Sequence, residues 1–174
     1  MAETFLVISL CILLIYAEAK RDFSIEVEDI TVNLKDITFI KSLNFSQTNK
    51  QTMNMDLIFN RNISKWPARA SLYLLTKAKR RISLFQVNFD VCRLLQDRAP
   101  NNFLSIFKKE LLRTSNVPHR GPFVENVLYW ARNYSVNEDA FPSTLPETAW
   151  EFVFNINSND LNAGFFKISG HVRK

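Results

Sequence analysis

Large apolar side chains occupy every second position of residues 150–156, at Trp150, Phe152, Phe154 and Ile156. A period of two is typical of a β-strand with one buried face. Residues 53–59 alternate in the same way, with apolar side chains on the odd positions. These two patterns predict strands at residues 150–156 and 53–59. Shorter alternating or apolar runs predict other strands at residues 23–27, 37–43, 70–76, 82–91, 123–134 and 165–172.

Two of these runs carry additional information on topology. Residues 70–76 and 82–91 flank a short basic turn, which predicts a β-hairpin. In residues 123–134, the stretch from Val127 to Trp130 would place apolar side chains on both faces of a strand. We therefore expect a central strand there, or one that is covered on both sides.

The period changes between residues 92 and 115. The apolar positions there follow helical spacing and are Phe103, Leu104, Phe107 and Leu111. Asn102 suits the N-cap of this helix, and Lys108 and Lys109 lie opposite its apolar stripe. An apolar stripe on one helix predicts packing against a sheet edge or face. A lid or a membrane-contacting helix is the alternative.

About seven or eight strands and one inserted amphipathic helix predict an all-β fold, a β-sandwich or β-cup. No linker or repeat divides the chain, so residues 20–174 are expected to form a single domain. The strand at residues 150–156 carries a heavy aromatic load. Such rings are compatible with a filled core or with a hollow one that holds an apolar ligand.

The first 19 residues have the features of a signal peptide. Residues 5–16 are an apolar run too short to span a bilayer, and Ala17-Glu18-Ala19 forms a small-x-small cleavage site. No second long apolar run follows. The pattern predicts a secreted, extracellular protein.

Removal of residues 1–19 takes away Glu3 and Glu18 and no basic residue, so the formal charge rises from +5 to +7. Four basic residues cluster in the predicted hairpin turn, namely Lys77, Lys79, Arg80 and Arg81. Such a cluster is compatible with a solvated turn, and also with attraction to anionic lipid headgroups or an acidic partner. Nucleic acid is not expected as a partner, because the chain has no recognition motif for it.

Cleavage of the signal peptide would also remove Cys11 and leave Cys92 as a single cysteine, so that no disulfide can form within the chain. We expect Cys92 to be buried as a small apolar side chain. A reactive thiol and an intermolecular bridge are the alternatives. Three Asn-x-Ser sequons are acceptor candidates for N-glycosylation, at Asn44, Asn62 and Asn133.

The chain has no local signature of an enzyme. His119 and His171 are its histidines, and no zinc, phosphate-loop or nucleophile motif occurs. No catalytic residue, metal or cofactor is therefore predicted, which leaves binding as the function. The aromatic side chains suit an apolar small molecule, a lipid or a hydrocarbon, and they suit a filled core equally well. From their strand positions, the pocket candidates are Trp130, Phe152, Phe154 and Phe165. The alternative is a filled-core interaction protein that uses its basic face to bind a receptor, a channel ectodomain or a glycan.

Three segments, in this order, resemble a large, mostly dipteran family of small secreted proteins. The first is Asn88-Phe-Asp-Val-Cys-Arg-Leu-Leu95, the second is Asn116-Val-Pro-His119-Arg-Gly-Pro-Phe123, and the third begins at Leu145-Pro146 and leads into the strand at Trp150. The resemblance covers roughly residues 68–172. The family is similar to the chemosensory B-type proteins of flies and, more distantly, to the ganglioside-activator and ML lipid-recognition domains.

The resemblance implies a secreted, immunoglobulin-like, ML-like β-cup that holds a lipid or a cuticular hydrocarbon without catalysis. It also implies a setting in contact chemosensation or pheromone response, with a membrane receptor or channel as a further partner. Two departures from the family pattern stand out. Gly121 occupies a family cysteine position, and Phe39 and Ile40 occupy the region of another, so the family disulfides are absent here.

Overall fold

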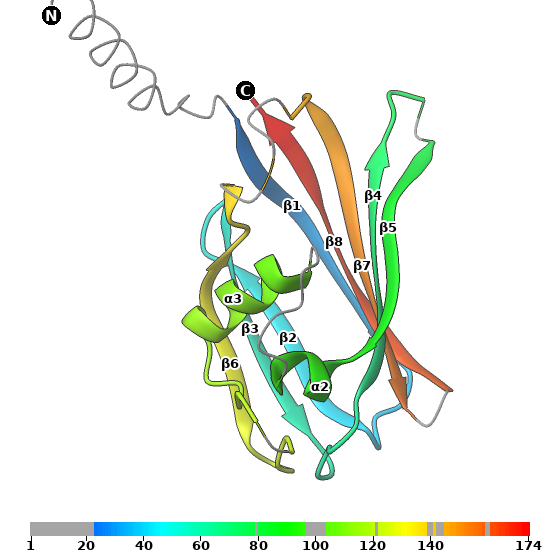
Figure 1. Cartoon of the computed structure of the whole chain (residues 1–174), viewed down its shortest axis with the longest axis vertical. Helices are drawn as coiled ribbons and strands as arrows, with labels where there is room; N and C mark the ends of the chain where they lie inside the picture. The colour runs from blue at the N-terminus through cyan, green and yellow to red at the C-terminus, as the bar shows by residue number, and fades with distance from the viewer. Residues whose placement is uncertain are drawn as a thin grey trace, which may run out of the picture.

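The computed structural model describes residues 23–78, 80–96, 104–120, 122–138, 141, 145–158 and 161–174. This part of the chain forms eight strands and two helices (Figure 1). The strands are β1 (Ser24–Leu34), β2 (Ile40–Gln47), β3 (Thr52–Phe59), β4 (Pro67–Leu75), β5 (Arg81–Asp90), β6 (Leu128–Ser135), β7 (Thr148–Ser158) and β8 (Leu161–Arg173). The helices are α2 (Val91–Gln96) and α3 (Leu104–Thr114).

The strands form two antiparallel sheets, which confirms the predicted all-β sandwich. One sheet has the order β1-β8-β7-β4-β5 and the other has the order β2-β3-β6. β4 and β5 pair as the predicted hairpin. The longest-range pairing joins β1 to β8, so the two ends of the described chain lie side by side in the larger sheet.

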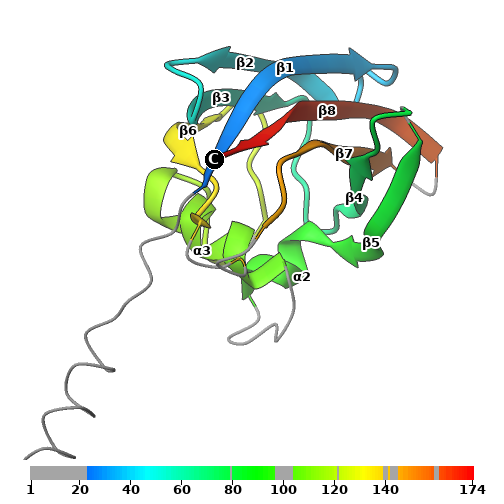
Figure 2. The same ribbon diagram turned by 90° about the horizontal axis from the view of Figure 1, so that it is seen from above.

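The two sheets are joined differently at their two sides, as Figure 2 shows. On one side β1 lies against β2, where the Val27 amide donates to the Lys50 carbonyl (2.6 Å) and the Gln47 side chain donates to the Val27 carbonyl (2.5 Å). On the other side the edge strands β5 and β6 stand apart, and α2 and α3 span the opening between them. The helices therefore complete the wall of the sandwich.

Strand β7 shows why alternation predicts burial. Trp150 and Ile156 point between the sheets and are buried, whereas the odd-numbered residues point away from the sandwich interior. Glu151 on that outer face is covered by longer side chains, since Arg81 lies 2.7 Å and Lys167 3.9 Å from its carboxylate. The inward face packs aromatic rings against the smaller sheet.

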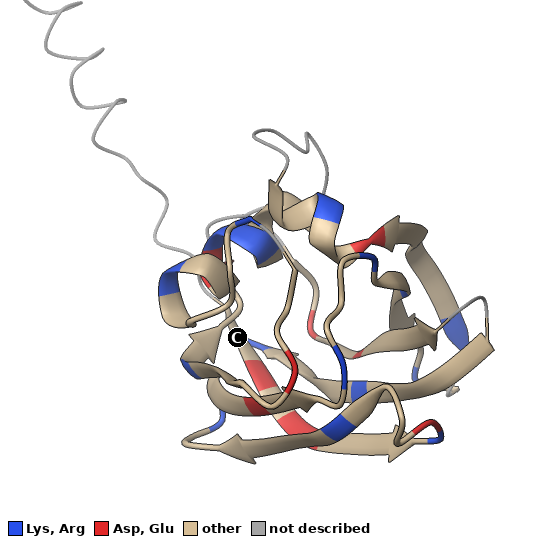
Figure 3. Cartoon of the chain, turned by 90° about the horizontal axis from the view of Figure 1, so that it is seen from below, with Lys and Arg blue, Asp and Glu red and all other residues tan. Residues whose placement is uncertain are grey.

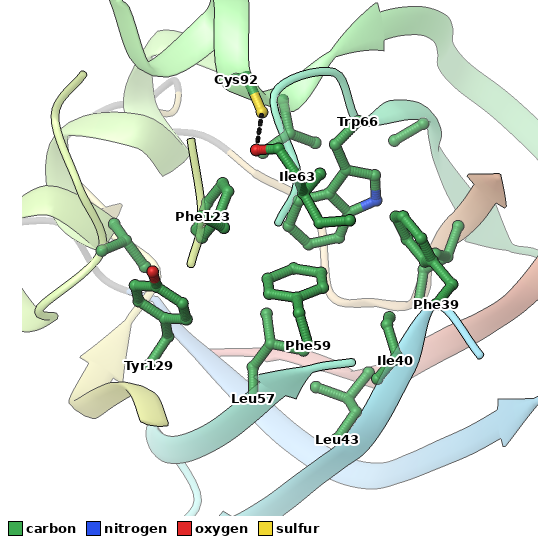
Figure 4. Packing of buried hydrophobic residues seen from close by; sticks show 14 of the residues in the cluster. Phe39, Ile40, Leu43, Leu57, Phe59, Ile63, Trp66, Cys92, Phe123 and Tyr129 are labelled. Atoms are coloured by element: carbon green, nitrogen blue, oxygen red, sulfur yellow. Dashed lines mark hydrogen bonds between the residues drawn. The ribbon is translucent and has the colours of Figure 1, made fainter. Parts of the chain in front are cut away.

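A cluster of aromatic rings fills part of the interior (Figure 4). Phe59 is fully buried at the centre of this cluster. Its ring lies 5.2 Å from Trp66, 5.2 Å from Phe123 and 5.8 Å from Phe39, measured between centroids. Edge-to-face and tilted pairs of this kind stabilise a core beyond the area that they bury. No disulfide is present among the described residues to assist them.

Two of the predicted strands begin several residues later in the structure. The predicted strand at residues 123–134 begins only at Leu128, because Asn126 adopts a positive φ of 57° and turns the chain. β6 is an edge strand and not a central one, and Leu128 is 45% exposed. Similarly, β2 begins at Ile40, because the Asp36 carboxylate holds residues 36–39 in a turn by accepting from the Thr38 amide (2.9 Å).

One helix was predicted between the strands, and the structure has two. Helix α2 follows β5 directly, and Asp90 is its N-cap, since the Asp90 carboxylate accepts from the Arg93 amide (2.9 Å). Six residues are too few for a helical period to be recognised in sequence. Helix α3 lies where the spacing predicts it and buries Leu104, while its predicted N-cap Asn102 lies outside the described residues.

No helix in the described part of the chain is long and apolar enough to span a bilayer. The predicted signal peptide, residues 1–19, lies outside that part and remains a prediction. Gly121, which stands at the family cysteine position, also lies outside the described part of the chain.

Candidate ligand-binding site

A cavity of about 200 Å³ lies between the two sheets and is closed on one side by α2 and α3. Its walls come from both sheets and both helices, and nearly all of the lining side chains are aliphatic or aromatic. Among the described lining residues, Lys108 is the charged one and Tyr134 carries the one hydroxyl. An apolar molecule would therefore be held mainly by burial of its surface.

Three phenylalanine rings form the wall on the larger sheet. Phe154 of β7 stacks on Phe166 of β8, with centroids 4.9 Å apart and planes inclined by 11°. Phe152 lies 6.3 Å from Phe166. All three residues point inward and line the cavity, yet they are partly exposed, unlike Trp150 and Ile156 on the same strand face. Their exposure is consistent with free space between the sheets.

Helix α3 closes the cavity with its apolar stripe. The Phe107 ring stacks on Phe152, with centroids 5.6 Å apart, and Leu104 and Leu111 line the cavity beside it. Lys109 is exposed on the opposite side, as predicted, whereas Lys108 lines the cavity. The helix thus packs against the core through the face that the sequence pattern indicates.

The structure brings together two of the four pocket candidates. Phe152 and Phe154 lie on the cavity wall. Trp130 and Phe165 do not line the cavity, because each is one position out of phase with the inward residues of its strand. Trp130 instead lies beside the Arg132 guanidinium, at 5.6 Å from ring centroid to Cζ.

Sequence reasoning missed Phe166, the partner of Phe154 in the β7–β8 register. Phe165 and Phe166 are adjacent, so the local pattern alone leaves open which of them points inward. The signal that resolves it is the alternation over the rest of β8, where Ile168 and Val172 are buried. Contact of any of these rings with a ligand remains a prediction.

The size of the cavity limits what it can hold. Pockets for small molecules commonly measure about 300–1,000 Å³, whereas an apolar cavity of about 150 Å³ holds a molecule of the size of benzene. At about 200 Å³ this cavity suits a small apolar molecule or a short acyl segment. A longer chain would require displacement of α3 or of the rings beneath it.

Tyr134 brings a polar group to this apolar wall. Burial, with the nearby negative charge of Glu110 as a second cause, raises the pKa of the Tyr134 hydroxyl well above its usual value. The hydroxyl therefore stays protonated and can donate a hydrogen bond. Glu110 is itself held by Arg113, whose Nε and Nη2 donate to its two carboxylate oxygens at 2.9 and 2.5 Å.

Cys92 does not line the cavity and belongs to the same core cluster as Phe59 and Trp66. It is free and buried, and its Sγ lies 3.7 Å from the Ile63 carbonyl. Burial, followed by the charge of Asp90, raises the pKa of the Cys92 thiol to about 11. The thiolate is thus disfavoured, and the side chain is suited to packing rather than to nucleophilic chemistry.

The segments that carry the family resemblance have structural roles. The Asp90 carboxylate accepts from the Trp66 amide (3.1 Å) as well as capping α2. Asn116 lies along the edge of β6, where its side chain donates to the Leu128 carbonyl (3.0 Å) and accepts from the Trp130 amide (2.6 Å). Phe123 is buried and exchanges backbone hydrogen bonds with Ile63. These residues position the helices that close the cavity.

Not all of the basic residues at the turn between β4 and β5 are available to bind a partner. Lys77 and Arg80 are exposed, but Arg81 pairs with Glu151 and covers the Tyr73 ring at 5.5 Å. Lys79 lies outside the described residues. Figure 3 shows basic and acidic residues interspersed along the ribbon rather than gathered on one face.

The remaining candidate residues lie on the surface. Asn44, Asn62 and Asn133 are all exposed, so glycan attachment at each remains a prediction that the positions allow. His119 is exposed, and His171 Nδ1 lies 2.8 Å from the Glu28 carboxylate. Within the described residues no three histidine, cysteine or acidic side chains gather as a metal site.

Comparison with known families adds one finding. Residues 68–152 match the model of a family described as "Protein of unknown function (DUF1091)". The match begins in β4 and ends in β7, and it includes both helices and the segments around Cys92 and Asn116. No curated protein sequence is significantly similar to the chain.

Proposed function

We propose that this protein is a secreted, non-catalytic carrier or presenter of a small apolar ligand that it holds between its two sheets. The observation that carries the proposal is the apolar cavity of about 200 Å³, with Phe152, Phe154 and Phe166 inward and partly exposed on its wall. Burial of a ligand there contributes roughly 25 cal/mol for each Å² of apolar surface removed from water.

The biological setting follows from the resemblance to the chemosensory B-type and ML lipid-recognition proteins. The family match over residues 68–152 lies within the part of the chain that carries this resemblance. The resemblance, and not the description of the matched family, is the basis for a role in contact chemosensation or pheromone response, with a lipid or cuticular hydrocarbon as the ligand and a membrane receptor or channel as the downstream partner.

The first test is direct extraction. Protein purified from its native secretion would be treated with organic solvent, and the extract analysed by mass spectrometry. We expect a small apolar compound in stoichiometric amount. An extract without such a compound, together with no binding of the fluorescent probe 1-aminoanthracene, would refute the proposal.

A cavity-filling variant locates the site. Ala131 is buried, points inward from β6 and lines the cavity, so Ala131→Leu places extra carbon atoms in the ligand space. We expect probe affinity to fall at least tenfold while the circular dichroism spectrum is retained. Ala149→Leu is the matched control, since Ala149 is an alanine on the outer face of β7.

A second candidate function is binding of a receptor, a channel ectodomain or a glycan through the basic turn. It is favoured by the exposure of Lys77 and Arg80 at the tip of the β4–β5 hairpin. The double substitution Lys77→Glu and Arg80→Glu should then abolish binding to cells without changing probe binding. Unchanged binding to cells would reject this function.

A further inference from the structure

Three exposed apolar side chains gather in one short segment of the surface. Val124, Val127 and Leu128 are 45%, 39% and 45% exposed, and they are three of the seven large apolar side chains that are exposed among the described residues. We call these three residues the apolar turn. Leu128 also begins β6, which is an edge strand. Exposed apolar side chains beside a sheet edge favour aggregation unless something covers them.

The apolar turn is fixed against the loop between β3 and β4. Ile63 of that loop and Phe123 exchange backbone hydrogen bonds of 2.8 and 2.9 Å. The Asn126 amide donates to the Phe59 carbonyl at 2.9 Å, and the positive φ of Asn126 turns the chain there. The loop and the apolar turn therefore hold a fixed position relative to each other.

One of the three N-glycosylation sequons lies in this loop. Asn62-Ile-Ser64 falls between β3 and β4, whereas Asn44 lies within β2 and Asn133 within β6. Asn62 and Ser64 are exposed, and Ile63 between them is buried. A surface loop is the setting in which an occupied sequon is expected in a secreted protein.

The Asn62 side chain is itself bonded to the apolar turn. Its Oδ1 atom accepts a hydrogen bond of 3.0 Å from the amide of Glu125, the residue that follows Val124. The oxygen of a carboxamide is its acceptor, and the nitrogen is a separate atom that the glycan would occupy. Because the oxygen is held at the Glu125 amide, a sugar joined to Nδ2 would begin beside the backbone of the apolar turn.

A sugar has the surface that such a patch requires. The ring faces of a pyranose carry C–H groups, and their contact with valine and leucine side chains removes apolar area from water. The hydroxyl groups of the sugar stay hydrated, so the covered surface becomes polar. A protein partner is the competing occupant of the turn, but it would have to displace a glycan attached at Asn62.

We propose that Asn62 carries an N-linked glycan and that the first sugars of this glycan cover Val124, Val127 and Leu128. The proposal selects one of the three sequons and assigns to it the protection of the apolar turn and of the edge strand that begins there. It requires entry into the secretory pathway, as the proposed function does, and it is independent of the cavity.

The test uses the full chain secreted from a mammalian cell line. Mass spectrometry of proteolytic peptides should find Asn62 glycosylated. Ser64→Ala removes the sequon and keeps the Asn62 side chain with its hydrogen bond to Glu125, whereas the matched control Ser64→Thr keeps the sequon as well. Hydroxyl-radical footprinting then compares the solvent exposure of individual side chains in the two variants.

We expect oxidation of the apolar turn to be roughly twofold higher in Ser64→Ala than in Ser64→Thr, because a bulky, hydrated glycan no longer covers it. Ile82 and Leu84 are the internal reference. Both are exposed, and Ile82 pairs with Leu74 at the end of β4 that is far from the β3–β4 loop. Their oxidation should be equal in the two variants.

A second measurement avoids any effect of residue 64 on folding. Peptide N-glycosidase removes the glycan from the folded parent protein and produces Asn62→Asp, which retains an acceptor for the Glu125 amide. Oxidation of the apolar turn should rise after this treatment as it does in Ser64→Ala.

The outcomes separate this inference from the proposed function. An unglycosylated Asn62 in the secreted protein would overturn the inference and leave the carrier function standing. A glycosylated Asn62 with equal oxidation of the apolar turn, with and without the glycan, would overturn it as well, since the sugars would then point away from the patch. Retention of the chain in the cytosol with residues 1–19 attached would refute secretion, and both proposals with it.

Discussion

Phe107 on α3 and Phe152 on β7 stack with their ring centroids 5.6 Å apart and their planes inclined by 22°. The two residues are separated by 45 positions in sequence, and their contact joins the helix that closes the cavity to the strand that forms its far wall. This pair therefore ties α3 to the larger sheet across the cavity.

Replacement of this ring should loosen the helix. We expect Phe107→Ala to reduce the free energy of unfolding by about 1–3 kcal/mol, less than for a fully buried phenylalanine, because Phe107 is partly exposed. Hydrogen exchange in residues 104–114 should rise, and 1-aminoanthracene should dissociate faster. Phe165→Ala is the control, since Phe165 does not line the cavity. Equal exchange of α3 in both variants would contradict the role assigned to Phe107.

Asp90 joins three elements and should be sensitive to substitution. Its carboxylate caps α2 through the Arg93 amide and holds the Trp66 amide at the start of β4. Because Asp90→Ala leaves both donors without their partner, we expect a loss of about 1–3 kcal/mol in urea unfolding. Asp29→Ala, at an exposed aspartate, should lie within about 0.5 kcal/mol of the parent. Similar stabilities of the two variants would refute the structural role of Asp90.

The Cys92 thiol predicts a loss of stability at high pH. Its pKa is about 11 in the folded protein against an ordinary value of 9.0, so the folded state binds the proton more tightly than the unfolded state. This contribution to the free energy of unfolding is present in full below pH 9 and is lost as the pH rises through 11, and it amounts to at most about 3 kcal/mol. Unfolding of the parent and of Cys92→Ala should be compared between pH 8 and 11, since other groups titrate alike in both. If the free energy of unfolding depends on pH in the same way for both proteins, the raised pKa of Cys92 is contradicted.

Gly170 occupies a position where β1 and β8 approach closely. A Cβ atom there would lie 1.8 Å from the Glu26 carbonyl oxygen and 3.0 Å from Cζ2 of Trp150. We therefore expect Gly170→Ala to reduce the free energy of unfolding by more than about 2 kcal/mol or to prevent the recovery of folded protein. Ser169→Ala, one residue earlier, should be tolerated. Normal yield and melting temperature for Gly170→Ala would show that the strands separate more easily than their packing indicates.

Much of the fold could be predicted because its signals are local. Alternation at residues 150–156 identified both the strand and its buried face, as Trp150 and Ile156 confirm. Helical spacing identified the stripe of α3 that packs inward. Both patterns arise from backbone geometry within a few residues, so no distant contact is needed to read them.

The mistaken details have non-local causes. The apolar residues around Leu128 indicated a central strand, but β6 lies at a sheet edge, where Asn116 pairs with it from a distant segment. The placement of Trp130 away from the cavity has the same origin, since the phase of β6 is set by its pairing with β3. Pairing between strands depends on the whole chain, so it cannot be recognised from a short stretch of sequence.

The sequence by itself determined the strands, the inward face of β7 and the amphipathic helix, because side-chain periodicity follows directly from strand and helix geometry. Only the tertiary structure decided that Phe166 and not Phe165 lies beside Phe154, and that α2 and α3 span the gap between β5 and β6. It also decided that the aromatic residues leave a cavity and do not fill the interior completely. The space between two layers depends on how both sheets pack together, and no single strand contains that information.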